Sequence, residues 1–150
     1  MLRRFYEALR AREEERRARF EEFVEWAKKS FQGRLTLILF GSRARGDQSM
    51  LSDYDVLAIC EGDVFEALRE RAPTGVQLFH LSPRRIEEEV GGFNTIVIDA
   101  ALEGRVVYDG LGVWERLRRL AGREVERRGL AKTGIGWMPA RRAKRPDPSG

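Results

Sequence analysis

The chain is 150 residues long, with 42% apolar and 35% charged residues, and its 28 basic against 24 acidic side chains give a formal net charge of +4. This length is enough for one compact domain with a core, and the positive excess favours anionic partners such as nucleotides or RNA. No stretch of about 18 apolar residues exists, the first residues lack the apolar core of a signal peptide, and the single Cys60 excludes an intrachain disulfide, so we expect a cytoplasmic protein.

Leu2 to Phe31 is predicted to form one long helix, because the segment lacks glycine and proline and places opposite charges three and four residues apart. One such set is Glu13 with Arg16 and Arg17. The second half carries an apolar stripe that should pack on a sheet: Phe20, Phe23, Val24, Ala27 and Phe31. The first half carries a separate apolar patch: Leu2, Phe5, Tyr6 and Leu9. This patch is interpreted either as the solvated start of the helix or as a contact surface for a second subunit, which would make a homo-oligomer, or for a partner helix.

A short apolar segment, Leu35 to Phe40, suits a strand that is covered on both faces and is too short for a helix. Gly41 ends it, and because glycine has no Cβ another group can approach the backbone there. Ser42 adds a hydroxyl and an N–H group at the start of the next turn. If that turn is helical, Arg43 and Arg45 present two guanidinium groups to the same anion. The pattern predicts a turn that binds a nucleotide through its phosphates.

Two acidic residues, Asp53 and Asp55, stand at the start of a second predicted strand that continues to Ile59. A strand period of two puts both carboxylates on one face, with Cα atoms about 6.6 Å apart. Two negative charges so placed repel each other, and a divalent cation held between them removes the repulsion. Mg²⁺ is usually bound by one or two carboxylates, waters and substrate phosphate oxygens. The sequence therefore predicts a Mg²⁺ or Mn²⁺ site beside the phosphate-binding turn.

The run G-S-R-A-R-G starts at Gly41, and ten residues separate Ser42 from Asp53, which Asp55 follows. This pattern resembles the minimal nucleotidyltransferases of the DNA polymerase β-like superfamily. These small proteins are often encoded beside a HEPN-domain partner. The resemblance implies that Gly41 and Ser42 hold the β and γ phosphates of a nucleoside triphosphate such as ATP, and that the two aspartates bind the metal ions and are catalytic. It also implies an antitoxin whose acceptor hydroxyl lies on a HEPN toxin.

A third carboxylate in that family comes from a later strand, where it is a metal ligand and activates the attacking hydroxyl. The matching segment here, Val76 to Leu81, carries Gln77 at this position, and a glutamine cannot accept a proton at neutral pH. Either another residue substitutes, or the chain binds nucleotide with weak or no transfer. His80 should point to the opposite face of this strand. We therefore interpret it as a strand-end residue in preference to a catalytic base. Asp47 is interpreted as a turn residue.

The remaining elements predict an α/β (α+β) fold with a mixed sheet of about four strands, helices mainly on one face and the site at the sheet edge where the first two strands meet. Ser82 is expected to cap a helix that starts at Pro83. The state of Phe93 to Leu102 is ambiguous from its residues, and the family resemblance favours a helix with Asp99 facing solvent. The other predicted elements are helices over 63–71 and 112–128 and strands over 76–81 and 105–108. A nucleotidyltransferase domain over 1–128 is expected.

Residues 129–150 are predicted to be a glycine- and proline-rich tail without regular structure. The tail contains a basic cluster, Arg141, Arg142, Lys144 and Arg145. This cluster either improves solubility only or contacts RNA or an acidic partner, with Trp137 as an aromatic anchor.

The leading hypothesis from these observations is a metal-dependent nucleotidyltransferase that passes a nucleoside monophosphate, from ATP by the resemblance, to an acceptor hydroxyl. The alternative is a catalytically weak nucleotide- or protein-binding module that neutralises a partner by docking. The sequence does not name the acceptor.

Overall fold

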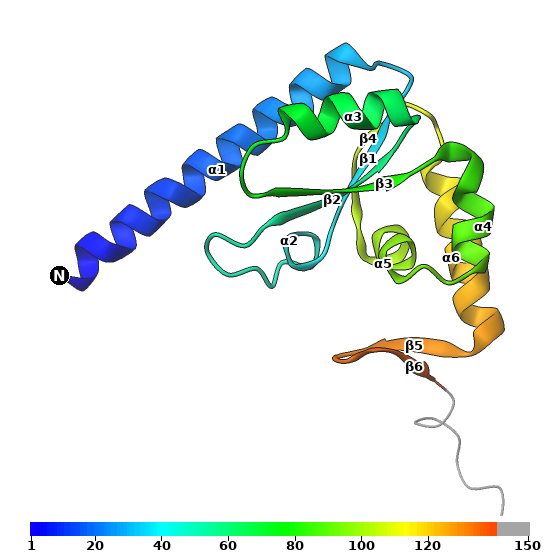
Figure 1. Cartoon of the computed structure of the whole chain (residues 1–150). Helices are drawn as coiled ribbons and strands as arrows, with labels where there is room; N and C mark the ends of the chain where they lie inside the picture. Colours follow the sequence, from blue (N-terminus) through cyan, green and yellow to red (C-terminus); the bar gives the residue numbers. More distant parts are fainter. Residues whose placement is uncertain (141–150) are drawn as a thin grey trace, which may run out of the picture.

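The computed structural model of the chain describes residues 1–140. Its centre is a sheet of four strands in the order β3-β2-β1-β4 (Figure 1). Strand β1 (Thr36–Phe40) runs antiparallel to both of its neighbours, β2 (Tyr54–Ile59) and β4 (Arg105–Asp109), whereas β3 (Val76–Leu81) runs parallel to β2. The predicted mixed sheet of four strands and the α/β fold class are therefore confirmed.

Helices cover both faces of the sheet, which corrects the expectation that they lie mainly on one. On one face, alternate residues of β1 and β2 form a core with α1 (Leu2–Ser30) and α3 (Gly62–Arg71). On the other face, the intervening residues pack on α4 (Ile86–Gly91), α5 (Thr95–Glu103) and α6 (Trp114–Arg128). Every residue of β1 is buried, because the strand is enclosed on both sides. Four of its five residues are apolar, and the hydroxyl of Thr36 donates a hydrogen bond to Asp109 at 2.8 Å.

The N-terminal end of α1 extends away from the rest of the protein, while the second half of the helix lies along the sheet (Figure 1). Phe20, Phe23, Val24 and Ala27 are buried, as the apolar stripe predicts. The apolar patch near the N-terminus remains exposed, with Leu2 at 73% and Phe5 at 59% of their full accessibility. Within the described residues, no helix combines the length and apolar character that a membrane span needs.

The ambiguous segment after Gly92 is helical. Asn94 caps α5, because its side-chain oxygen accepts hydrogen bonds from the backbone N–H groups of Ile96 and Val97 at 3.1 and 3.4 Å. This cap offsets the weak helix propensity of the β-branched residues that follow. Asp99 is half-buried rather than solvent-facing, because it accepts a hydrogen bond from Trp137 and pairs with Lys132.

The expected cap at Ser82 is not formed. The side chain of Ser82 makes no capping hydrogen bond, and its hydroxyl is buried without a partner within the described part of the chain. Residues Pro83–Arg85 form a 3₁₀ turn, η1, which is closed by the N–H group of Arg85 on the carbonyl of Ser82 at 2.9 Å. The α-helix α4 therefore begins only at Ile86.

The chain after Gly129 is not irregular throughout, which corrects the prediction for the tail. Strands β5 (Leu130–Thr133) and β6 (Gly136–Pro139) pair as an antiparallel hairpin. Trp137 attaches this hairpin to α5, because its indole N–H donates to Asp99 at 2.9 Å and its ring meets Phe93 edge-on with centroids 6.0 Å apart. The basic cluster at Arg141, Arg142, Lys144 and Arg145 lies outside the described residues, as does the rest of the predicted tail.

Candidate nucleotide and metal site

The turn that follows β1 has the backbone geometry of a glycine-dependent bend. Gly41 has φ 75° and ψ −155°, a combination that is essentially restricted to glycine. Its carbonyl accepts the N–H groups of Ala44 and Arg45, both at 3.1 Å, and this begins the one-turn helix α2 (Ser42–Arg45). The predicted strand, glycine bend and short helix are all present.

The second aspartate of the motif lies directly against this bend. Asp55 pairs with Phe40 across the antiparallel strands β2 and β1, so the residue after Phe40 comes next to it. The Oδ2 atom of Asp55 lies 2.6 Å from the position that a Cβ on Gly41 would occupy. Only a residue without a side chain lets the carboxylate come this close. The structure therefore brings Asp55 and the Gly41–Ser42 turn together.

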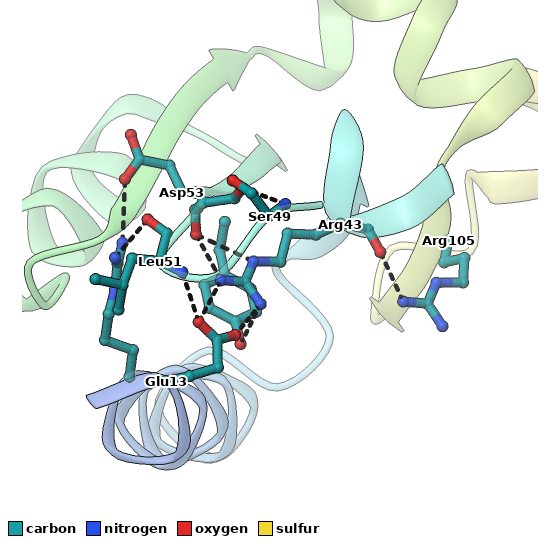
Figure 2. Close-up of polar contacts among 9 residues, drawn as sticks. Glu13, Arg43, Ser49, Leu51, Asp53 and Arg105 are labelled. Atoms are coloured by element: carbon teal, nitrogen blue, oxygen red, sulfur yellow. Dashed lines mark hydrogen bonds and ion pairs between the residues drawn. The ribbon is translucent and has the colours of Figure 1, made fainter. Parts of the chain in front are cut away.

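The first aspartate of the motif, Asp53, lies one residue before β2. It is exposed, with 61% of its side chain accessible. Its Oδ1 atom is 3.2 Å from Nη2 of Arg16, which reaches it from α1 (Figure 2). The Arg16 guanidinium also occupies the space beside Gly75 in which any Cβ would clash. Asp53 thus has a cationic partner that the local sequence does not reveal.

The negative charge of Asp53 acts on Asp55. The pKa of Asp55 is raised, first by burial and then by the negative charge of Asp53, while Arg45 lowers it. A carboxylate pair of this kind suits a hard divalent cation, because the cation offsets both the burial and the repulsion. Asp53 and Asp55 are the two residues that could hold such an ion. Among residues 1–140, no group of three His, Cys, Asp or Glu side chains gathers as a metal site.

Gln77 occupies the position expected for a third carboxylate. It pairs with Asp55 across the parallel strands β3 and β2, so both side chains belong to the same face of the sheet, and it is exposed. His80 does not share this face. Its Nε2 atom is 2.7 Å from the carbonyl oxygen of Cys60 and its ring stacks on Phe65 with centroids 4.5 Å apart.

Of the two arginines in the motif, Arg45 is the more accessible to an anion, and it also lies 4.0 Å from Glu103. Its side chain is 39% accessible, near enough to Asp55 to lower the pKa of that carboxyl group, and 3.2 Å from Asp47 in the loop that follows. Arg43 has only 4% of its side chain accessible, and Glu13 holds it in a two-point ion pair. A guanidinium engaged in this way is not free for a phosphate, so the structure does not support that part of the prediction for Arg43.

Glu13 is the residue that the sequence-based prediction missed. The charge pattern pairs it with Arg16 and Arg17 on its own helix, but its carboxylate instead contacts Arg43, 30 positions away. It also accepts the backbone N–H group of Leu51 at 2.8 Å (Figure 2). These hydrogen bonds, with that of Arg43 first, lower the pKa of Glu13 to about 2. No local signal marks Glu13 among the neighbouring glutamates.

A cavity of about 450 Å³ opens beside the first aspartate. It lies between α1 and the connection from α3 to β3, and its lining residues are Arg12, Glu15, Arg16, Arg19, Leu51, Asp53, Thr74 and Gly75. The cavity gives room for a substrate group next to Asp53.

Together, the bend at the end of a buried strand, the carboxylate against it and the second carboxylate nearby form the candidate site. The model of the family described as "Nucleotidyltransferase domain" matches residues 10–125, so the chain belongs to this family. Among solved structures, the chain is similar to one described as "Crystal structure of the toxin-antitoxin with AMP-PNP", with 14% identity, a TM-score of 0.49, and coverage of 73% of this chain and 89% of that one. A comparison with curated proteins gives no match.

Proposed function

We propose that the chain transfers a nucleoside monophosphate from a nucleoside triphosphate, with ATP as the expected donor, to an acceptor hydroxyl. The observation that carries this proposal is the contact of the Asp55 carboxylate with the Gly41 bend, because one bound metal–triphosphate could touch both. Membership of the nucleotidyltransferase family supports the reaction class.

Each residue of the site has an assigned role in this proposal. Gly41 and Ser42 bind the triphosphate through backbone N–H groups and the serine hydroxyl, and Arg45 adds a positive charge. Asp53 and Asp55 would hold Mg²⁺ or Mn²⁺. When bound, the metal ion would supply charge neutralisation for the triphosphate and for the pyrophosphate that leaves. The arrangement favours transfer by orientation and charge stabilisation, with the acceptor oxygen forming the new bond to the α-phosphorus as the bond to pyrophosphate breaks.

The test is transfer of label from α-³²P-ATP with Mg²⁺ to the acceptor. Asp53→Asn and Asp55→Asn should each lower transfer by at least about 100-fold, because each keeps the size of the side chain and removes the charge. Asp63→Asn is the matched control, since Asp63, in the first turn of α3, is exposed and pairs with Arg34 at 3.0 Å. Full labelling by the Asp53→Asn protein would refute the catalytic assignment.

For the acceptor, we propose a hydroxyl on a HEPN-domain protein, with the chain as its antitoxin. The support is the family resemblance of the motif, G-S-R-A-R-G followed by Asp53 and Asp55. Co-expression with a HEPN-domain protein, taken from the neighbouring gene where that gene encodes one, should produce a mass increase of one AMP on that protein, and Asp55→Asn should abolish the increase. A partner that stays unmodified yet is neutralised would favour the second candidate function.

That second candidate is a module that binds nucleotide or protein with weak or no transfer. Gln77 favours it, because Gln77 stands opposite Asp55 where a carboxylate would complete the site. The module predicts that ATP binds and the partner is neutralised while no AMP is transferred. Calorimetric titration with ATP and Mg²⁺, in parallel with the labelling assay, separates the two functions.

Two further contacts remain proposals. The exposed patch with Leu2 and Phe5 on α1 could pair with a second copy of the chain or with a partner helix, and light scattering of the Phe5→Glu protein would test self-association. RNA binding by the basic tail would be lost on deletion of residues 129–150 and would weaken steeply with salt.

A further inference from the structure

Arg43 links the two segments that carry the site. It stands one position after Ser42, in the one-turn helix α2 that follows the Gly41 bend. Its side chain reaches across to the loop before β2, where Nε and Nη2 donate to the carbonyl of Ser52 at 3.0 and 2.7 Å. Ser52 is the residue immediately before Asp53. A single guanidinium therefore sets the distance between the phosphate turn and the first aspartate.

Glu13 completes this link from the third element, α1. The two carboxylate oxygens of Glu13 bind the guanidinium of Arg43, and only 13% of the Glu13 side chain is accessible. One of these oxygens also accepts the N–H group of Leu51, two residues before Asp53. The same loop is thus held at Leu51 by Glu13 and at Ser52 by Arg43 (Figure 2).

Aromatic packing restricts the guanidinium further. The Arg43 side chain lies over the ring of Tyr54, 4.2 Å from its centroid, and Phe20 of α1 stacks on Tyr54 with centroids 4.3 Å apart. Arg43 thus has its fork of donors and its flat face both occupied, a geometry that a lysine cannot reproduce.

We propose that Glu13 and Arg43 are positioning residues for nucleotidyl transfer, holding Asp53 at a fixed place relative to the Gly41–Ser42 turn. This inference rests on the proposed function. A buried ion pair is often replaceable by apolar side chains with no loss of stability, so stability alone does not account for this one. What apolar side chains cannot replace is the pair of directed bonds to Leu51 and Ser52.

The experiment compares Arg43→Lys and the double variant Glu13→Leu/Arg43→Met with wild type and with Glu25→Gln. Glu25 is the matched control, because it pairs with Lys28 in an exposed contact on the same helix. The measurements are the Mn²⁺ dissociation constant by electron paramagnetic resonance, kcat and KM for AMP transfer from ATP, and the melting temperature. Arg43→Lys keeps the charge next to Glu13, so it is informative even if the double variant does not fold.

We expect both variants to weaken Mn²⁺ binding and to lower kcat by at least tenfold at temperatures where they are folded, while Glu25→Gln stays within twofold of wild type. Folded variants that bind Mn²⁺ and transfer AMP within twofold of wild type would overturn the positioning role and leave the proposed function intact. A wild-type protein that neither binds Mn²⁺ nor transfers AMP would overturn the proposed function, and the positioning role with it.

Discussion

Gln77 lies directly opposite Asp55 on the neighbouring parallel strand. A site with Asp at this position would have a third negative charge beside the pair formed by Asp53 and Asp55. With Gln77, the site has an exposed amide that can orient a hydroxyl group but cannot take its proton. We therefore expect the balance between the proposed transfer and simple nucleotide binding to depend on this residue.

Gln77→Asp should raise the rate of AMP transfer. A carboxylate there adds a metal ligand and a proton acceptor, and general bases commonly contribute a factor of about 100 or more. The rate of label transfer from ATP is the measurement, and Gln48→Asp, in the exposed loop, is the control for added negative charge. An unchanged rate together with unchanged Mn²⁺ affinity would show that the site does not use this position.

Gly41→Ala should abolish transfer and destabilise the fold by about 1–3 kcal/mol, the usual cost of forcing another residue into a glycine conformation. The new Cβ would also collide with the Asp55 carboxylate. Gly33→Ala is the matched control, because Gly33 has a similar φ of 78° but no atom within 4 Å of an added Cβ. Urea unfolding should show a cost in both proteins, whereas loss of transfer should be confined to Gly41→Ala. Equal transfer by the two variants would contradict the close approach.

The raised pKa of Asp55 predicts how stability depends on pH without metal. The folded protein favours the neutral carboxyl group, so ionisation of Asp55 lowers the free energy of unfolding as pH rises from about 3.8 through the higher folded pKa. Asp55→Asn should therefore be more stable than wild type at pH 7 in the presence of EDTA, and the difference should vanish below pH 3.8. Added Mg²⁺ should stabilise wild type more than the variant. A less stable Asp55→Asn protein at pH 7 would contradict this prediction.

Glu13 should show the opposite pH dependence. Its pKa falls from 4.5 to about 2 on folding, so its contribution to stability is present above pH 4.5 and is lost as pH falls toward 2. Glu13→Gln should cost roughly 3 kcal/mol at pH 7, near the lower limit for a broken buried ion pair. Unfolding measured from pH 7 to 3 should show this cost shrinking, while Glu25→Gln stays close to wild type throughout. A cost that does not change with pH would mean that the Glu13 charge is not the cause.

The hairpin after α6 should be coupled to α5 through one hydrogen bond. Trp137→Phe removes the donor to Asp99 and keeps most of the apolar ring, so the expected loss is about 1 kcal/mol. A double-mutant cycle with Asp99→Ala, measured by thermal unfolding, isolates this contact. Additive losses in the double variant would show that the hairpin and α5 are not linked by this bond.

The sequence alone predicted the parts of this protein that depend on short-range rules. An unbroken apolar run indicates a strand covered on both faces, Gly41 next to Ser42 indicates a bend, and the period of two along a strand puts Gln77 and His80 on opposite faces. That Gln77 is the one beside the aspartates came from the family resemblance. These rules involve residues that are neighbours along the chain or partners on paired strands, and the structure follows them. The same rules do not specify a cap at Ser82, because whether a hydroxyl reaches an N–H group depends on the local backbone path.

Only the tertiary structure decided which charges meet. Glu13 has suitable arginines three and four residues away, yet it binds Arg43 because α1 packs on the sheet face beneath Tyr54 and brings the two together. Arg16 reaches Asp53 for the same reason. Ion pairs between distant segments are set by how helices dock on a sheet, and periodicity encodes the face that a residue occupies but not the residue it meets across the core.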